Sequence, residues 1–166
     1  MQPYNWNQFV LRVPVNANTK SIYDAWTTTE GIESWFLRKA VYTSPANRVR
    51  SELEPVQPGD KYVWLWHGYD DTFAEKGKII ACNEEDFFQF EFSGGCIVTV
   101  NVKSEQGENI CELVQDMTPP DEKDKQFFFI ECQKGWTFYL TNLKSVLETG
   151  YDLRNKNVDI PKVVTA

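Results

Sequence analysis

The sequence is poor in the side chains on which most acid–base and metal chemistry depends. It contains one histidine, His67, among 166 residues, so a site with several histidine ligands is excluded and a histidine-based triad lacks support. No phosphate-binding loop, dinucleotide fingerprint or EF-hand pattern occurs. We favour a solvated histidine at a strand end over a general base, and solvated turns over metal ligands for the acidic runs 70–71 and 84–86. We therefore predict no catalytic residues, no metal and no cofactor.

Cysteine is also scarce. Cys82, Cys96, Cys111 and Cys132 form no CxxC pair, and the gaps between them fit no zinc pattern. Three of them lie in apolar, strand-like segments, so we expect buried free thiols. Residues 1–15 lack the basic start and continuous apolar run of a signal peptide, and no segment is long enough to span a membrane. We expect a reduced, cytoplasmic protein.

Positive charge is neither abundant nor clustered. The net charge is −7, and the closest basic groupings are Arg48 with Arg50 and Lys123 with Lys125. A surface that binds a nucleic acid duplex needs clustered lysine and arginine to neutralise phosphate. We therefore expect neither a nucleic acid nor an anionic membrane surface as a partner.

Aromatic side chains, in contrast, are plentiful. Six Trp, seven Tyr and eleven Phe make up 14% of the chain, and each ring buries a large apolar area. Such a composition predicts either a well-packed aromatic core or an open cavity lined by rings. Both interpretations demand the same pattern of inward-facing residues, so the sequence leaves the choice open.

Hydrophobic periodicity places the elements along the chain. Alternating apolar residues predict strands over 6–15, 39–43, 59–67, 75–82, 87–92, 96–103 and 109–117. Spacings of three and four residues predict two short helices over 19–28 and 29–37 and one long helix over 126–149. The short loops between successive strands predict antiparallel neighbours. The fold class is therefore α+β, with a curved antiparallel sheet of about six strands around the long helix.

The long C-terminal helix has one unusual residue. Gly135 lies in its interior, where glycine costs roughly 1 kcal/mol relative to alanine. Such a glycine indicates that something approaches the helix backbone closely. We favour a neighbouring strand over a ligand. Gly150 fits the end of this helix, and we expect a domain over 1–150 followed by a loosely packed polar tail over 151–166.

Two segments resemble a known superfamily. One runs Ile22-Tyr23-Asp24-Ala25-Trp26-Thr27, then Glu30-Gly31-Ile32 and Trp35-Phe36. The other runs Gly135-Trp136, then Leu140, Leu143-Lys144, Leu147-Glu148 and Gly150. They resemble the opening helix pair and the closing helix of START-like, helix-grip proteins, the SRPBCC superfamily. Within it, the chain resembles the branch similar to the C-terminal domain of heat-shock-protein-90 ATPase activators.

This resemblance implies a pocket between the concave face of the sheet and the long helix. Superfamily members use that pocket for lipids, sterols, polyketides and other apolar molecules, and a few are cyclases, hydrolases or dehydratases. Co-chaperone members carry a separate N-terminal domain, for which we expect no room in this chain. The leading hypothesis is non-catalytic binding of a small apolar or amphipathic molecule. The alternatives are a protein-interaction module that contacts a chaperone or another protein, and a cyclase- or hydrolase-type enzyme.

The candidate ligand-binding residues face the predicted interior. Gln115 and the Tyr139 hydroxyl are the candidate polar groups that would orient a ligand. The full predicted set is Trp35, Trp64, Trp66, Phe88, Phe90, Phe92, Gln115, Trp136, Tyr139, Leu140 and Leu143.

Overall fold

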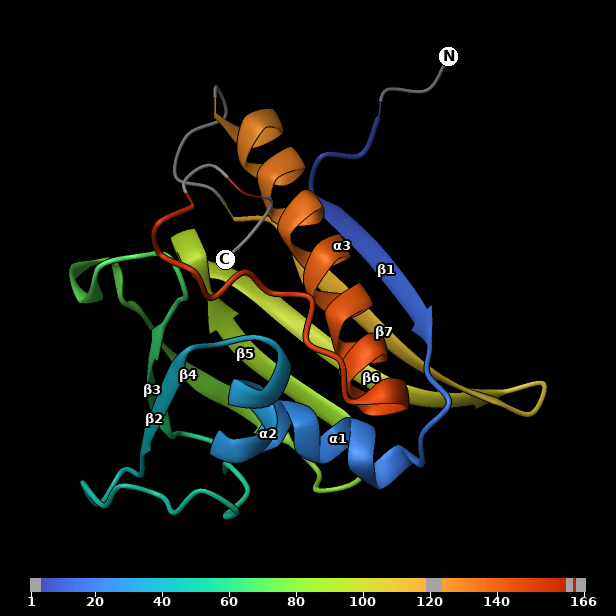
Figure 1. The fold of residues 1–166 in the computed structure, drawn as a ribbon, viewed down its shortest axis with the longest axis horizontal. Helices are drawn as coiled ribbons and strands as arrows, with labels where there is room; N and C mark the ends of the chain where they lie inside the picture. The colour runs from blue at the N-terminus through green and yellow to red at the C-terminus, as the bar shows by residue number, and fades with distance from the viewer. Residues whose placement is uncertain (1–3, 119–123, 161–162, 164–166) are drawn as a thin grey trace.

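A computed structural model describes residues 4–118, 124–160 and 163 (Figure 1). The predicted elements are confirmed in type and order. The structure adds two short 3₁₀ segments that were not predicted, η1 (Asp71–Phe73) and η2 (Ser93–Gly95). The full order is β1 (Gln8–Pro14), α1 (Thr19–Thr27), α2 (Thr29–Trp35), β2 (Lys39–Thr43), β3 (Lys61–Leu65), η1, β4 (Glu75–Cys82), β5 (Phe87–Phe92), η2, β6 (Cys96–Glu105), β7 (Glu108–Asp116) and α3 (Lys125–Thr149).

The strands of the described residues form one antiparallel sheet of seven, in the order β1-β7-β6-β5-β4-β3-β2. From β2 to β7 each strand pairs with its successor along the chain, and β1 completes the sheet beside β7. We had expected about six strands. A register shift between Ile79 and Ala81, where β4 pairs with β5, is an irregularity of the kind that bends a sheet. The sheet therefore presents a concave face.

Helix α3 lies across that concave face, and α1 and α2 lie beside its C-terminal end on the same side of the sheet (Figure 1). The side of α3 that faces the sheet buries Phe129, Trp136 and Leu143. The helix ends at Gly150, which adopts a left-handed conformation with φ of 75° and donates its N–H to the carbonyl of Val146. This end matches the prediction, because glycine adopts that conformation without steric cost.

The two short helices are fixed by their caps. Asn18 accepts a hydrogen bond from the backbone N–H of Ser21 at 2.7 Å, and the Thr28 hydroxyl accepts one from Gly31 at 3.0 Å. Each bond satisfies an N–H that the first turn of a helix leaves unpaired. Gly31 has no room for a side chain, because a Cβ atom there would overlap the carbonyl oxygen of Asp24. The α1–α2 junction therefore requires glycine.

The C-terminal tail is anchored at the buried Arg154, so the expectation of loose packing is wrong at that residue. The Arg154 side chain is 1% exposed. Its guanidinium donates to the carbonyl oxygens of Glu33, Ser34 and Leu37, each at 2.9 Å, and pairs with Asp152 at 2.7 Å. These carbonyls lie at the end of α2, where a helix has unpaired acceptors. The composition of the tail does not reveal this, because the contacts come from the single residue Arg154 and from Asn142 and Ser145 of α3.

We expect Arg154→Ala to lower the free energy of unfolding by about 3 kcal/mol, because it leaves the buried carbonyls of Glu33, Ser34 and Leu37 without their donor and removes a buried charge from beside Asp152. Urea denaturation followed by circular dichroism measures the change. Lys20→Ala is the matched control, since Lys20 pairs with Asp24 on an exposed helix face and should cost less than about 1 kcal/mol. Equal losses in the two variants would contradict this account of the tail.

Candidate ligand-binding site

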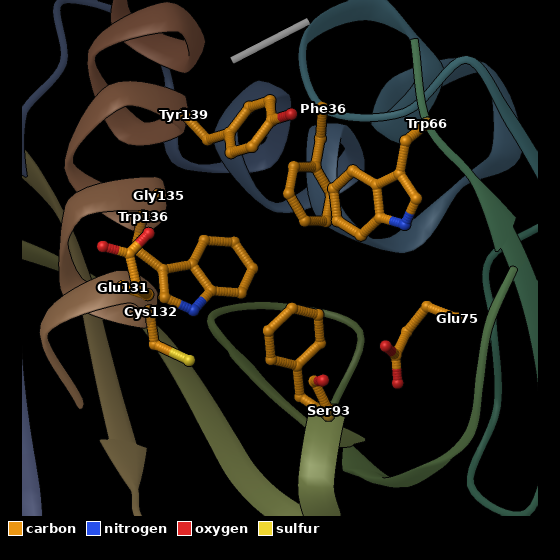
Figure 2. A pocket seen from close by; sticks show the side chains of 10 residues that line it. Phe36, Trp66, Glu75, Ser93, Glu131, Cys132, Gly135, Trp136 and Tyr139 are labelled. Atoms are coloured by element: carbon orange, nitrogen blue, oxygen red, sulfur yellow. The ribbon is translucent and has the colours of Figure 1, made fainter. Parts of the chain in front are cut away.

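A cavity of about 250 Å³ lies between α3 and the concave face of the sheet. Figure 2 shows side chains of α3 on one wall, with residues that follow α2 and β3 and residues of β4 and β5 opposite. The walls are largely apolar, and the few polar groups come from β4, η2 and α3. The lining residues are Phe36, Trp66, Glu75, Phe92, Ser93, Glu131, Cys132, Gly135, Trp136 and Tyr139.

Phe36 organises the aromatic wall. Its ring stacks on Trp136 with centroids 4.9 Å apart, and it meets Trp66 and Tyr139 edge-on at 4.9 and 4.7 Å. These are the geometries that aromatic pairs prefer. The rings hold one another at fixed angles, so the wall is a preformed surface. Phe36 was absent from the predicted set, although it belongs to the Trp35-Phe36 pair that carried the family resemblance.

Gly135 opens the α3 side of the cavity. Apart from the local backbone of α3 and the two adjacent residues, no atom of the described residues lies within 4 Å of the position that a Cβ atom would occupy there. The preferred expectation, that a neighbouring strand approaches this glycine, is therefore wrong. The glycine faces the cavity, and its missing side chain leaves that space empty.

The predicted residues divide into two groups. Trp66, Phe92, Trp136 and Tyr139 line the cavity. The others form the packed core that supports it, with Trp35 and Trp64 fully buried and in ring contact with Trp26 and Tyr62. The core members of the predicted set are Trp35, Trp64, Phe88, Phe90, Gln115, Leu140 and Leu143. The interior thus has a filled region and a hollow region.

Gln115 holds the cavity wall in place. Its side-chain oxygen accepts a hydrogen bond from the Trp136 indole at 2.7 Å, and its amide nitrogen lies 3.4 Å from the sulfur of Met117. The residue is fully buried, and a buried amide needs such partners. Gln115 therefore fixes the orientation of Trp136 and does not itself line the cavity.

Glu75 is one of four polar lining residues that the prediction missed, with Ser93, Glu131 and Cys132. It pairs in register with Trp64, and the alternation of β4 places it on the same face as the buried Ile79. Burial raises the pKa of its carboxyl group above the ordinary value of 4.5, and a hydrogen bond with Ser93 partly opposes the shift. The signal was present in the sequence, because the expected strand over 75–82 puts a glutamate on an inward position.

The cavity thiol is held in its protonated form. Burial raises the pKa of Cys132 to about 11, against a smaller opposing effect of a hydrogen bond with Gln115. The thiolate is the reactive form of cysteine, so this residue behaves as part of the wall. All four cysteines are free, as expected.

His67 follows β3 in a half-buried turn and does not line the cavity. Burial lowers its pKa, and the positive charge of Arg154 acts in the same direction. Among residues 4–118, 124–160 and 163, no group of three or more histidine, cysteine, aspartate or glutamate side chains is placed to hold a metal ion. Within the same residues, no helix has both the length and the apolar character needed to cross a bilayer.

Comparison with known proteins connects this geometry to a family. The sequence model of the family described as activator of Hsp90 ATPase homolog 1-like protein matches residues 16–148. That range includes α1, α2, all strands from β2 to β7 and nearly all of α3. No curated protein sequence matches the chain.

Solved structures share the fold at low sequence identity. The protein SSP2350 from Staphylococcus saprophyticus matches with a TM-score of 0.70 and 16% identity, over 89% of this chain and 96% of the other. An Aha1 dimer from Colwellia psychrerythraea matches with a TM-score of 0.64 and 16% identity, over 86% and 97%. The protein BH1534 from Bacillus halodurans gives 0.62 and 16%, over 86% and 99%.

We expect Gly135→Ala to raise the free energy of unfolding by about 1 kcal/mol, because alanine favours the helix and its methyl group enters empty space. Denaturant unfolding measures the change. Gly31→Ala is the matched control, and we expect it to lose about 1 to 3 kcal/mol through overlap with α1. A loss of stability in Gly135→Ala would show that the space above the helix is filled.

We expect Glu75→Gln to raise the melting temperature at pH 7. The gain in the free energy of unfolding should be less than about 1 kcal/mol, since water still screens the partly exposed carboxylate. The raised pKa means that the ionised form disfavours folding, so the advantage of Gln is largest above the pKa of Glu75 in the folded protein. It should shrink as pH falls and vanish near pH 4, about where the carboxylate of the unfolded chain is protonated. Thermal melts across this range test the sign, and a pH-independent difference would contradict it.

Proposed function

Because this chain belongs to the activator of Hsp90 ATPase homolog 1-like family, we propose that it binds a small apolar or amphipathic molecule in the cavity between α3 and the sheet. The observation that carries the proposal is Gly135. Glycine in a helix interior lowers stability by about 1 kcal/mol relative to alanine. Here no described neighbouring element packs into the space that the missing side chain leaves. An empty, ring-lined space of this kind is suited to a ligand.

The chemistry of the walls supports a ligand with an apolar body. Ligand pockets are mostly apolar, with a few polar groups that set orientation. Five aromatic side chains line this cavity, and its polar groups are carboxylates, one serine, one thiol and the Tyr139 hydroxyl. A volume of about 250 Å³ favours a compact molecule over a sterol or a long acyl chain.

We propose that the ligand is bound without being converted. The reactive groups near the cavity argue for this. The pKa of Cys132 is raised to about 11, so the thiol is protonated at neutral pH and is a weak nucleophile. His67, the one histidine of the sequence, does not line the cavity.

A protein-interaction role is the second candidate. The family is described by its activation of the Hsp90 ATPase, and the net charge of −7 suits a basic partner surface through electrostatic complementarity. A chaperone accessory could use the outer surface and leave the cavity empty. The two candidates therefore differ in one expectation. A side chain that fills the cavity should abolish ligand binding but leave a protein interaction through the outer surface unchanged.

The binding test uses the neutral fluorescent probe N-phenyl-1-naphthylamine. We expect saturable binding to the native protein and at least a tenfold loss of affinity in Gly135→Leu, whose side chain would occupy the cavity. Thr137→Leu is the matched control, because it adds the same side chain on the exposed side of the same helix. Its affinity should stay within twofold of the native value.

Equal binding by Gly135→Leu and the native protein, with both shown folded by circular dichroism, would contradict the proposed site. Absence of probe binding to the native protein would contradict the binding function. If such a protein still formed a salt-sensitive complex with purified heat-shock protein 90, the second candidate would replace the first.

A further inference from the structure

The cavity holds a carboxylate that its protein surroundings do not neutralise. Glu75 lies half-buried on the concave face of the sheet and lines the cavity. Within the described part of the chain no lysine or arginine forms an ion pair with it, and its hydrogen-bond partner is the Ser93 side chain. Every other inward position of β3 and β4 is apolar, aromatic or glycine. A partly buried charge without a partner destabilises the fold. A ligand that carries a positive charge would therefore gain most by binding next to Glu75.

We infer that the ligand is an organic cation with an apolar body, and that its ammonium or amidinium group pairs with Glu75. This inference rests on the proposed function, since it names the class of molecule that the same cavity takes. A bound cation would neutralise the negative charge of this carboxylate. Figure 2 shows the Glu75 carboxylate on the wall that faces α3, across the cavity from Trp136.

The rings around Glu75 favour a cation as well. Trp66 and Phe92 are only partly buried, and both present ring surface to the cavity together with Phe36, Trp136 and Tyr139. The face of an aromatic ring attracts a cation within about 6 Å of its centre, most strongly for tryptophan. A carboxylate beside several rings therefore offers a cation two kinds of attraction, whereas it offers a neutral molecule only apolar contact.

The other charges of the cavity act against an anion. Glu131 is the second charged residue in the lining, to which the part of the chain that the structure describes contributes no lysine, arginine or histidine. Glu131 lies 3.5 Å from Lys134 on the exposed side of α3, which offsets some of its charge. A fatty acid or another carboxylate ligand would bring a third negative charge to this site. The lining therefore favours a cationic ligand by attraction and disfavours an anionic one by repulsion.

The experiment compares three molecules that share one skeleton: 4-phenylbutylamine, 4-phenylbutanol and 4-phenylbutyrate. Each displaces N-phenyl-1-naphthylamine from the native protein at pH 7 and low salt, and competition gives its affinity. We expect the amine to bind at least tenfold more tightly than the alcohol, and the carboxylate to bind most weakly. In Glu75→Gln the amine should keep less than a threefold advantage over the alcohol.

Glu85→Gln is the control for charge alone. Glu85 lies exposed in the turn between β4 and β5 and does not line the cavity, so its removal changes the net charge equally and should leave the amine's advantage intact. An equal loss of that advantage in Glu85→Gln and Glu75→Gln would overturn the assignment to Glu75.

The remaining outcomes separate the two proposals. If the alcohol binds and the amine binds no more tightly, or the carboxylate binds best, the cationic ligand is wrong while the binding cavity stands. If none of the three displaces the probe, and calorimetry detects no binding of any of them, the cationic ligand is also wrong, and the binding function then stands or falls with the Gly135-dependent binding of the probe.

Discussion

The structure depends on the contact between one long helix and one concave sheet, and Trp136 is the centre of that contact. Its ring stacks on Phe36, meets Phe92 at 5.1 Å and donates its indole N–H to Gln115. One side chain thereby joins α3 to β5, to β7 and to the residue that ends α2. A large ring with a satisfied polar atom fixes both the distance and the rotation of the helix. The cavity exists because the residue before this anchor, Gly135, contributes no side chain.

Two costs to stability meet in the same cavity. Gly135 lowers the helix propensity of α3 without relieving any clash. Glu75 places a carboxylate on the inward face of β4, and no cationic side chain of the described residues pairs with it. The two short helices, in contrast, follow local rules closely, with caps at Asn18 and Thr28, and each guanidinium nitrogen of the buried Arg154 finds an acceptor. Natural proteins tend to break such rules where function requires it. The coincidence of the two costs supports a binding role for this region.

The fold was largely predictable because its periodicities are strong. Alternation in FFQFEF and spacing along α3 specify the strand, the helix and their buried faces, and Gly150 marks the helix end. The contribution of Arg154 was not predictable, because its partners are backbone carbonyls of α2 far away in the sequence. The site was predictable only in part. The alternation of residues along a strand predicts which side chains point inward. Whether an inward side chain such as Trp64 or Trp66 packs in the core or lines the cavity depends on the position of α3 over the sheet. Glu75 could have been found by its strand position.

The most direct test of the ligand-binding cavity is a titration of the protein with 4-phenylbutanol followed by NMR of the six tryptophan indole N–H groups. Our account predicts saturable shifts of the Trp66 and Trp136 resonances, because these rings line the cavity, with much smaller shifts for Trp6, Trp26, Trp35 and Trp64. Resonances assigned by single Trp→Phe variants make the comparison residue by residue. Absence of any shift, or shifts led by tryptophans outside the cavity, would contradict the claim that the space beside Gly135 is a binding site.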